Sequence, residues 1–187
     1  MNTPPSFVQT QAGTLVLTRA TLADLPVVLA LLRESAAWIK EKGLHQWEGY
    51  LSEKGPSIVE KRFSEGEIHL AALDKKPVAT LCLQWQDPFI WEEKGLDQQA
   101  GYIHALAVQR KLAGKHLGKQ LMAWAEAAVA KHPRKYLRLD CMAENDGLFA
   151  YYEKQGYQWV DSKKTGQWEV KLLEKRLVQE PLRFPKR

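Results

Sequence analysis

The 187-residue sequence has only two cysteines, Cys82 and Cys141. Neither belongs to a Cys-x-x-Cys pair or to a Cys/His ligand spacing, so the sequence carries no signature of a structural metal site or a disulfide framework. We therefore expect no metal and a reducing, cytoplasmic setting. A Cys-His hydrolase built on either thiol is a weak alternative, because nothing in the sequence places a base beside one.

Long apolar runs are also missing. No stretch approaches the ~20 consecutive apolar residues of a membrane-spanning helix, so no membrane partner is expected. Residues 1–13 lack the basic and apolar regions of a signal peptide, and we interpret them as a flexible leader. No internal repeat or low-complexity linker interrupts the chain. With 45% hydrophobic and 26% charged residues, the composition predicts one globular domain at residues 14–177 and a basic tail at 178–187.

Positive charge is scarce in the first half of the chain. Residues 1–100 carry 10 lysines and arginines against 13 acidic residues, whereas residues 101–187 carry 17 against 9. The net charge of +5 therefore comes from the second half, which suits a polyanionic partner. No recognition helix or aromatic-studded basic sheet is visible, so nucleic acid is the weaker interpretation and is not expected.

One stretch in the basic half predicts an anion site. Residues 102–108 form an apolar run typical of a buried strand, and apolar residues then recur at helical spacing from about Gly114 to Lys131. The first amides of a helix lack internal partners, and the macrodipole adds about half a positive charge there. Gly114 and Gly118 allow a phosphate to approach the backbone closely. Formal positive charge is added by Lys111, Lys115 and Lys119.

Two segments together carry a family resemblance. Residues 113–118 resemble the acetyl-CoA loop of the GNAT acyltransferases, Gln/Arg-x-x-Gly-x-Gly/Ala. Gly118 matches the last glycine, while Ala113 and His116 depart from the motif, and a side chain at His116 falls where positive φ is expected. A second strand, residues 136–142, precedes the other family signature. Its matching positions are Asn145, Leu148, Tyr152, Gly156 and Tyr157.

The resemblance implies the GNAT fold, an α/β (α+β) architecture with a mixed, mostly antiparallel central sheet. About seven strands and about four flanking helices are expected, with splayed central strands forming the acetyl-CoA cleft. The chain order β-αα-ββ-β-α-β-α-β-β agrees with this. Besides the segments above, the expected strands are residues 14–20, 67–74, 78–85, 158–161 and 167–177, and the expected helices begin at the N-cap Asp24 and near Ile58.

The resemblance also implies an N-acetyltransferase that transfers an acetyl group from acetyl-CoA to a primary amine by direct attack in a ternary complex. The backbone amides of Leu106, Ala107 and Val108 would hold the acetyl and pantetheine groups. Asn145 would hydrogen-bond the pantetheine arm. Besides Lys111, the residues expected at the pyrophosphate are Gly114, Lys115, His116, Leu117, Gly118 and Lys119.

The resemblance implies that Tyr152 is the general acid, because it stands four residues before Gly156, the family's spacing for this role. An ordinary phenol with a pKa near ~10 stays protonated at neutral pH and can donate to the leaving thiolate. A packing role for Tyr152 stays open. Its neighbour Tyr151 is expected on a different helix face. His104, on the central strand, is a candidate general base, since imidazoles ordinarily titrate near pH ~6.5. A packing role for His104, or proton removal by water alone, stays open. Further possible acceptor-side groups are His45, Glu48 and Asp87.

Aromatic residues gather in the segments that would form the acceptor site. The expected substrate-binding residues are Trp38, His45, Gln46, Trp47, Trp85 and Trp91. Aromatic walls in an acidic half of the chain suit a cationic amine, so we expect a small-molecule or peptide amine as partner. Residues 36–47 resemble a bacterial GNAT subgroup of unassigned substrate, and a monomer or homodimer is expected. The main alternative is a catalytically weak, GNAT-like acyl-CoA sensor or interaction module.

Overall fold

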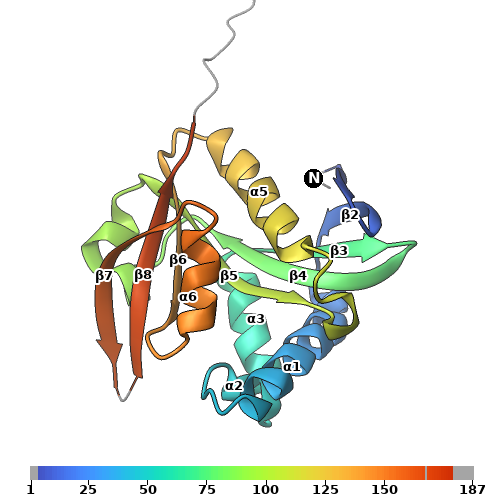
Figure 1. Ribbon diagram of the computed structural model, residues 1–187. Helices are drawn as coiled ribbons and strands as arrows, with labels where there is room; N and C mark the ends of the chain where they lie inside the picture. The colour runs from blue at the N-terminus through green and yellow to red at the C-terminus, as the bar shows by residue number, and fades with distance from the viewer. Residues whose placement is uncertain (1–3, 167, 179–187) are drawn as a thin grey trace, which may run out of the picture.

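The computed structural model describes residues 4–166 and 168–178. Within them the chain forms one eight-stranded sheet in the order β1-β2-β3-β4-β5-β6-β8-β7 (Figure 1). Only the β5–β6 pair is parallel. The strands are β1 (Ser6–Thr10), β2 (Gly13–Arg19), β3 (Glu67–Leu73), β4 (Lys76–Gln84), β5 (Ala100–Val108), β6 (Tyr136–Met142), β7 (Gln158–Thr165) and β8 (Trp168–Arg176).

Six α-helices accompany the sheet in the described part of the chain, with short 3-10 turns between some of them. They are α1 (Leu25–Glu41), α2 (Glu48–Leu51), α3 (Gly55–Glu65), α4 (Pro88–Trp91), α5 (Leu117–Ala130) and α6 (Asp146–Glu153). Helix α5 covers one face of the sheet, while α1, α2 and α3 gather on the other (Figure 1). Among these described helices, none is long and apolar enough to cross a bilayer.

Alternation along the strands sorts their side chains between two cores. In β4, Leu81 and Leu83 pack in the cluster that contains the buried face of α5. Cys82, between them, packs with the buried faces of α1 and α3. A sheet with helices on both faces therefore needs a nearly continuous apolar run in its central strands, which β4 has.

Strands β5 and β6 separate soon after they meet. Their parallel ladder has three pairs, from Ala100–Tyr136 to Tyr102–Arg138. On the other side of β5, the register with β4 shifts between Thr80 and Cys82, and Ala105 has a left-handed φ of 52°. A bulge of this kind bends a strand. The edge of β5 that would continue the ladder therefore faces an opening, which holds the candidate site.

The expected GNAT fold is confirmed, with corrections of detail. The sheet has eight strands rather than about seven, because the expected flexible leader is wrong over β1, which pairs with β2 along its full length. Helix α5 begins at Leu117, after the turn that contains Gly114. Asp24 is confirmed at the N-cap of α1. Of the expected basic tail, residues 179–187 lie outside the described residues.

Candidate active site

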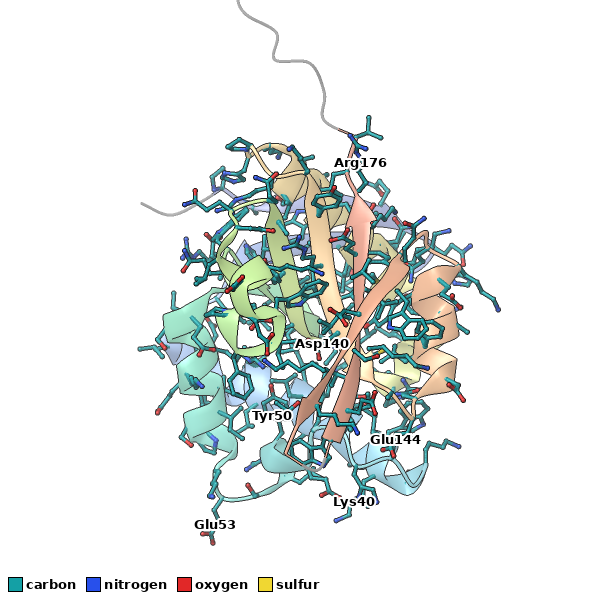
Figure 2. The ribbon with its side chains drawn as sticks, turned by 90° about the vertical axis from the view of Figure 1, so that its left-hand side faces the viewer. Lys40, Tyr50, Glu53, Asp140, Glu144 and Arg176 are labelled. Carbon is teal, nitrogen blue, oxygen red and sulfur yellow. The ribbon has the colours of Figure 1, made fainter. Side chains whose placement is uncertain are left out.

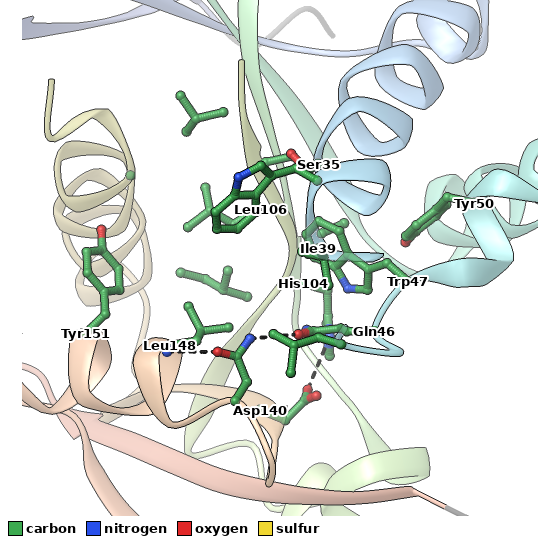
Figure 3. Close-up of a pocket in the computed structure, with 18 of the residues that line it drawn as sticks. Ser35, Ile39, Gln46, Trp47, Tyr50, His104, Leu106, Asp140, Leu148 and Tyr151 are labelled. Atoms are coloured by element: carbon green, nitrogen blue, oxygen red, sulfur yellow. Dashed lines mark hydrogen bonds and ion pairs between the residues drawn. The ribbon is translucent and has the colours of Figure 1, made fainter. Parts of the chain in front are cut away.

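A cavity of about 490 Å³ lies where β5 leaves β6 (Figure 3). Helix α1 and the loop after it form one wall, and the start of α6 forms the opposite wall. The run from Ile103 to Val108 crosses between them, so the expected acyl-binding residues Leu106, Ala107 and Val108 all line the cavity. The split in the sheet thus brings the backbone of β5 to a partly open, largely apolar pocket.

The start of α5 lies at one end of this cavity. His116 is the N-cap residue of α5 and has a left-handed φ of 57°, and Gly114 has a φ of 78°. The side chain of Leu117 is buried in the core, which fixes the first turn. Lys115 is exposed, but its amide already donates to the carbonyl of Leu112 at 3.2 Å. Among the amides expected to contact the pyrophosphate, the amide of Lys115 is therefore already used by a hydrogen bond within the turn.

Gly118 has a packing reason as well as an electrostatic one. A Cβ at this position would lie 3.0 Å from the hydroxyl oxygen of Tyr151, which reaches over from α6. Gly118 also lines the cavity, whereas the side chains of Lys111 and Lys119 are exposed to solvent. The absence of a side chain lets α6 close over the first turn of α5, where the unpaired amides and the helix dipole favour an anion.

Tyr151 and Tyr152 both line the cavity, from adjacent positions on α6 with different surroundings. Their rings lie 5.6 Å apart. Tyr151 is 37% exposed and Tyr152 is 8% exposed. Burial raises the pKa of Tyr152 well above its ordinary range, and the nearby Cys141 and Asp140 raise it further. Tyr152 is therefore held as a neutral hydroxyl.

Asn145 ties two walls of the cavity together. Its Oδ1 accepts a hydrogen bond from the amide of Leu148 at 3.1 Å, which makes it the N-cap of α6. Its Nδ2 donates to Oε1 of Gln46 at 3.4 Å, across to the loop between α1 and α2 (Figure 3). Both side chains line the cavity, as the expected roles require, and a contact of Asn145 with pantetheine stays a prediction.

His104 lies at the floor of the cavity between two carboxylates. Its Nε2 is 3.1 Å from Oδ2 of Asp87, and its Nδ1 is 3.7 Å from Oδ1 of Asp140. Burial raises the pKa of Asp140, although the charges of His104 and Arg62 oppose that rise. Burial alone would also raise the pKa of Asp87, but the contact with His104 brings it below its ordinary value.

Of the expected acceptor residues, Trp38, Gln46 and Trp47 line the cavity. Trp38 is stacked by Arg110, whose guanidinium carbon lies 3.7 Å from the ring centroid. His45 is not among the lining residues, because its side chain is 67% exposed and paired with Glu48 at 3.3 Å.

Two expected acceptor residues, Trp85 and Trp91, do not line the cavity. Trp85 packs against His132, with ring centroids 4.4 Å apart, at a separate surface pocket. Trp91 is 2% exposed and packs against Tyr102 in another core cluster. Both are aromatic residues in segments next to the site, and sequence alone does not say which face of the sheet they join.

Sequence reasoning missed Asp140. The signal was available, because a carboxylate in the middle of the apolar run 136–142 is unusual for a buried strand. The two cysteines are both buried, and burial raises the pKa of Cys82 to about 12 and that of Cys141 to about 12. Each is a protonated thiol in the core at neutral pH, which removes the basis for a cysteine nucleophile.

The geometry defines an α/β protein in which the start of a helix, a site that favours an anion, lies beside a partly open cavity in a split sheet. The profile of the Acetyltransferase (GNAT) family matches residues 30–157. The chain is 28% identical over 166 residues to the "Uncharacterized N-acetyltransferase YesJ" of Bacillus subtilis (strain 168), covering 86% of this chain and 89% of that protein.

Solved structures agree with this match. A GNAT-family acetyltransferase from Listeria monocytogenes superposes with a TM-score of 0.75 at 26% identity, covering 92% of this chain and 100% of the other. The PaiA N-acetyltransferase of Thermoplasma acidophilum, solved with coenzyme A, has a TM-score of 0.63 at 20% identity, covering 87% and 98%. The chain therefore belongs to the GNAT acetyltransferase family, a family of acyltransferases.

Proposed function

We propose that this protein transfers an acetyl group from acetyl-CoA to a primary amine of a small molecule or peptide, by direct attack in a ternary complex. The observation that carries the proposal is the continuity of the start of α5 with the cavity at the split between β5 and β6. A phosphate-bearing cofactor at the helix start can extend a linear arm along β5 into this cavity. Helix amides, the dipole and the lysines around Gly114 favour the pyrophosphate.

The reaction needs the thioester carbonyl to be polarised and the leaving thiolate to receive a proton. In the proposal, backbone amides of β5 between Leu106 and Val108 receive the carbonyl oxygen and the start of the pantetheine arm. The amine lone pair attacks the carbonyl carbon, the C–S bond breaks, and the sulfur takes the hydroxyl proton of Tyr152. The excess proton on the new amide nitrogen returns to the Tyr152 oxygen through water, and His104 is the candidate base for the incoming amine.

The other wall of the cavity suits an amine acceptor. Trp38, Trp47 and Tyr50 supply aromatic surface, and Asp140 supplies negative charge at the floor. A cationic amine gains from both, through cation–π contact and charge pairing. The alternative, an acyl-CoA sensor without transfer, would need the same cofactor site but no acceptor chemistry.

Calorimetry of CoA binding at low salt tests the cofactor half. Gly118→Glu should bind CoA at least about tenfold more weakly, because the new carboxylate both crowds Tyr151 and repels phosphate. Ala123→Glu, exposed further along α5, is the matched control and should bind like the wild type. The proposal fails if the wild-type protein binds no CoA. If CoA binds but no amine in a panel releases CoA from acetyl-CoA, the sensor replaces the enzyme.

A further inference from the structure

A cluster of three ionisable side chains lies at the floor of the cavity. Asp87, His104 and Asp140 come from three segments: the loop before α4, the strand β5 and the strand β6. The side chains of His104 and Asp87 are only 8% and 7% exposed. Charged groups so deeply buried are costly unless they are paired, so their arrangement calls for a physical reason.

Asp87 lies behind His104 and is fixed there. Its amide donates to the carbonyl of Gly95 at 3.1 Å, and its Oδ1 accepts from the amide of Ile90 at 3.1 Å. Its Oδ2 is left for Nε2 of His104, at 3.1 Å. These two atoms are buried and not yet aligned as a hydrogen bond, so a small rotation of the imidazole would satisfy both. Asp87 does not line the cavity, so it can act only through the ring.

Asp140 lies on the cavity side of the ring. Its Oδ1 is 3.7 Å from Nδ1 of His104, which is too long for a hydrogen bond, and both residues line the cavity (Figure 3). Asp140 lies near the centre of the molecule in Figure 2, yet its side chain keeps 22% of its surface accessible through the cavity. The gap leaves the carboxylate and the imidazole nitrogen both open to one incoming donor.

We propose that Asp140 binds the acceptor as its ammonium ion and that His104, held in orientation by Asp87, takes the proton that makes the amine nucleophilic. This inference rests on the proposed function and adds the residues that receive the acceptor: Asp140 for its charge, and His104 with Asp87 for its proton. One N–H bond of the ammonium breaks, its electron pair stays on nitrogen, and the proton bonds to Nδ1 of His104. After transfer, His104 releases that proton to solvent, which is the one proton the overall reaction produces.

The surrounding groups fit this assignment. Arg62 of α3 and Tyr50 of α2 also line the cavity, and the positive charge of Arg62 acts on both carboxylates. With a neutral imidazole, the two carboxylates and Arg62 sum to one negative charge, which an ammonium neutralises. One ligand-type atom from each of the three residues lies within 4.8 Å of the others. His104 turns Nε2 to Asp87 and Nδ1 to Asp140.

Binding to the CoA-loaded protein tests the role of Asp140 without turnover. Three amines are compared with their matched neutral alcohols: benzylamine with benzyl alcohol, phenethylamine with phenethyl alcohol, and tryptamine with tryptophol. The wild type should prefer at least one amine over its alcohol by about tenfold or more, and Asp140→Asn should lose that preference. Glu144→Gln, which removes an exposed carboxylate on the loop after β6, should keep it.

The outcomes separate this inference from the proposed function. An Asp140→Asn variant that retains the preference overturns the inference, and so does a CoA-loaded wild type that binds no amine. Failure of the wild type to bind CoA at all is instead a failure of the proposed function.

Stability provides a check that a merely structural ion pair would not pass. Burial raises the pKa of Asp140 above its ordinary 3.8. The contribution of the protonated carboxyl group to folding stability is therefore complete below pH 3.8 and is lost as pH rises through the folded-state pKa. At pH 7.5 the raised pKa of Asp140 therefore costs stability in the empty site. Asp140→Asn should melt at a higher temperature than wild type at pH 7.5, with the difference closing near pH ~4. A lower melting temperature for Asp140→Asn than for wild type at pH 7.5 would contradict the proposal that Asp140 is an acceptor-binding group rather than a structural ion pair.

Asp87 is tested as a positioning residue by imidazole NMR. In the wild type at high pH, the neutral ring of His104 should carry its proton on Nε2, toward Asp87, leaving Nδ1 free to accept. Asp87→Asn keeps an oxygen for the Ile90 amide, so the loop should survive, but it should shift the ring toward the other tautomer. An unchanged tautomer in Asp87→Asn removes Asp87 from the mechanism.

Discussion

At the scale of single residues, two adjacent tyrosines line one cavity with different surroundings. The hydroxyl of Tyr151 lies over the first turn of α5, beside Gly118. Tyr152 is buried and packs against Tyr157, with ring centroids 6.1 Å apart. Its pKa, raised by burial, keeps the hydroxyl protonated beyond the ordinary phenol value of 10.0. A neutral donor at every physiological pH is what a leaving thiolate requires.

Tyr152→Phe should therefore lower kcat by about 10²–10⁴-fold, which is the usual loss when a general acid is removed. The affinity for acetyl-CoA should stay nearly unchanged, because the ring is retained. Steady-state kinetics with the best amine of the panel measures both quantities. Tyr151→Phe makes the same chemical change one position away and should keep kcat within about threefold, well below that loss. Equal rates for wild type and Tyr152→Phe, with chemistry rate-limiting, would remove Tyr152 from the reaction.

At the scale of elements, the start of α5 combines a buried anchor with a left-handed cap. Leu117 fixes the helix to the core while His116, immediately before it, takes a φ of 57°. Histidine tolerates this conformation better than branched residues do. The departure from the family glycine at this position therefore leaves the loop conformation intact, at a modest cost in strain.

His116→Val should lose about 1–3 kcal/mol of unfolding free energy, because a β-branched residue opposes positive φ. It should also weaken CoA binding measurably, since the expected contacts with the pyrophosphate depend on that backbone shape. His116→Gly is the matched change that permits the shape, and it should bind CoA within about threefold of wild type. Urea unfolding and calorimetry measure the two effects. A valine variant that binds CoA as well as glycine does would contradict the dependence on loop shape.

At the scale of the whole molecule, a short joint holds the two halves of the sheet together. The β5–β6 ladder has three pairs, and Gly101 is in the middle one. A Cβ on Gly101 would lie 2.5 Å from Cγ2 of Val129 in α5, far inside contact distance. The absence of a side chain at Gly101 therefore lets Val129 of α5 pack directly against the joint.

Gly101→Ala should destabilise the protein by about 1–3 kcal/mol, the usual cost of overpacking a core. Gly147→Ala is the control, because a Cβ there would meet only Oδ1 of Asn145, at 3.9 Å. That variant should be neutral or stabilised by about 0.5–1 kcal/mol, since alanine is favoured over glycine in a helix. Denaturant unfolding measures both, and a Gly101→Ala variant as stable as Gly147→Ala would show that the joint can relax.

Sequence by itself determined most of the strands and helices, and it predicted an anion site at the start of α5. Strand β4 and helix α5 follow from local periodicity, and the anion site follows from a glycine-containing helix start, because both are properties of short segments. The N-cap role of Asn145 is local in the same way, since a side chain bonds an amide three residues away.

Only the tertiary structure decided the acceptor end. Trp38, Trp47, Trp85 and Trp91 are all tryptophans in segments near the expected acceptor site. Which of them line the cavity depends on the face and the end of the sheet that each one joins, and these are set by long-range register. The pairing of β1 with β2 was invisible for the same reason. Asp87, His104 and Asp140 meet only because β5 leaves β6 beyond Tyr102, and the divergence of two strands is set by their bulge and their packing rather than by any local pattern.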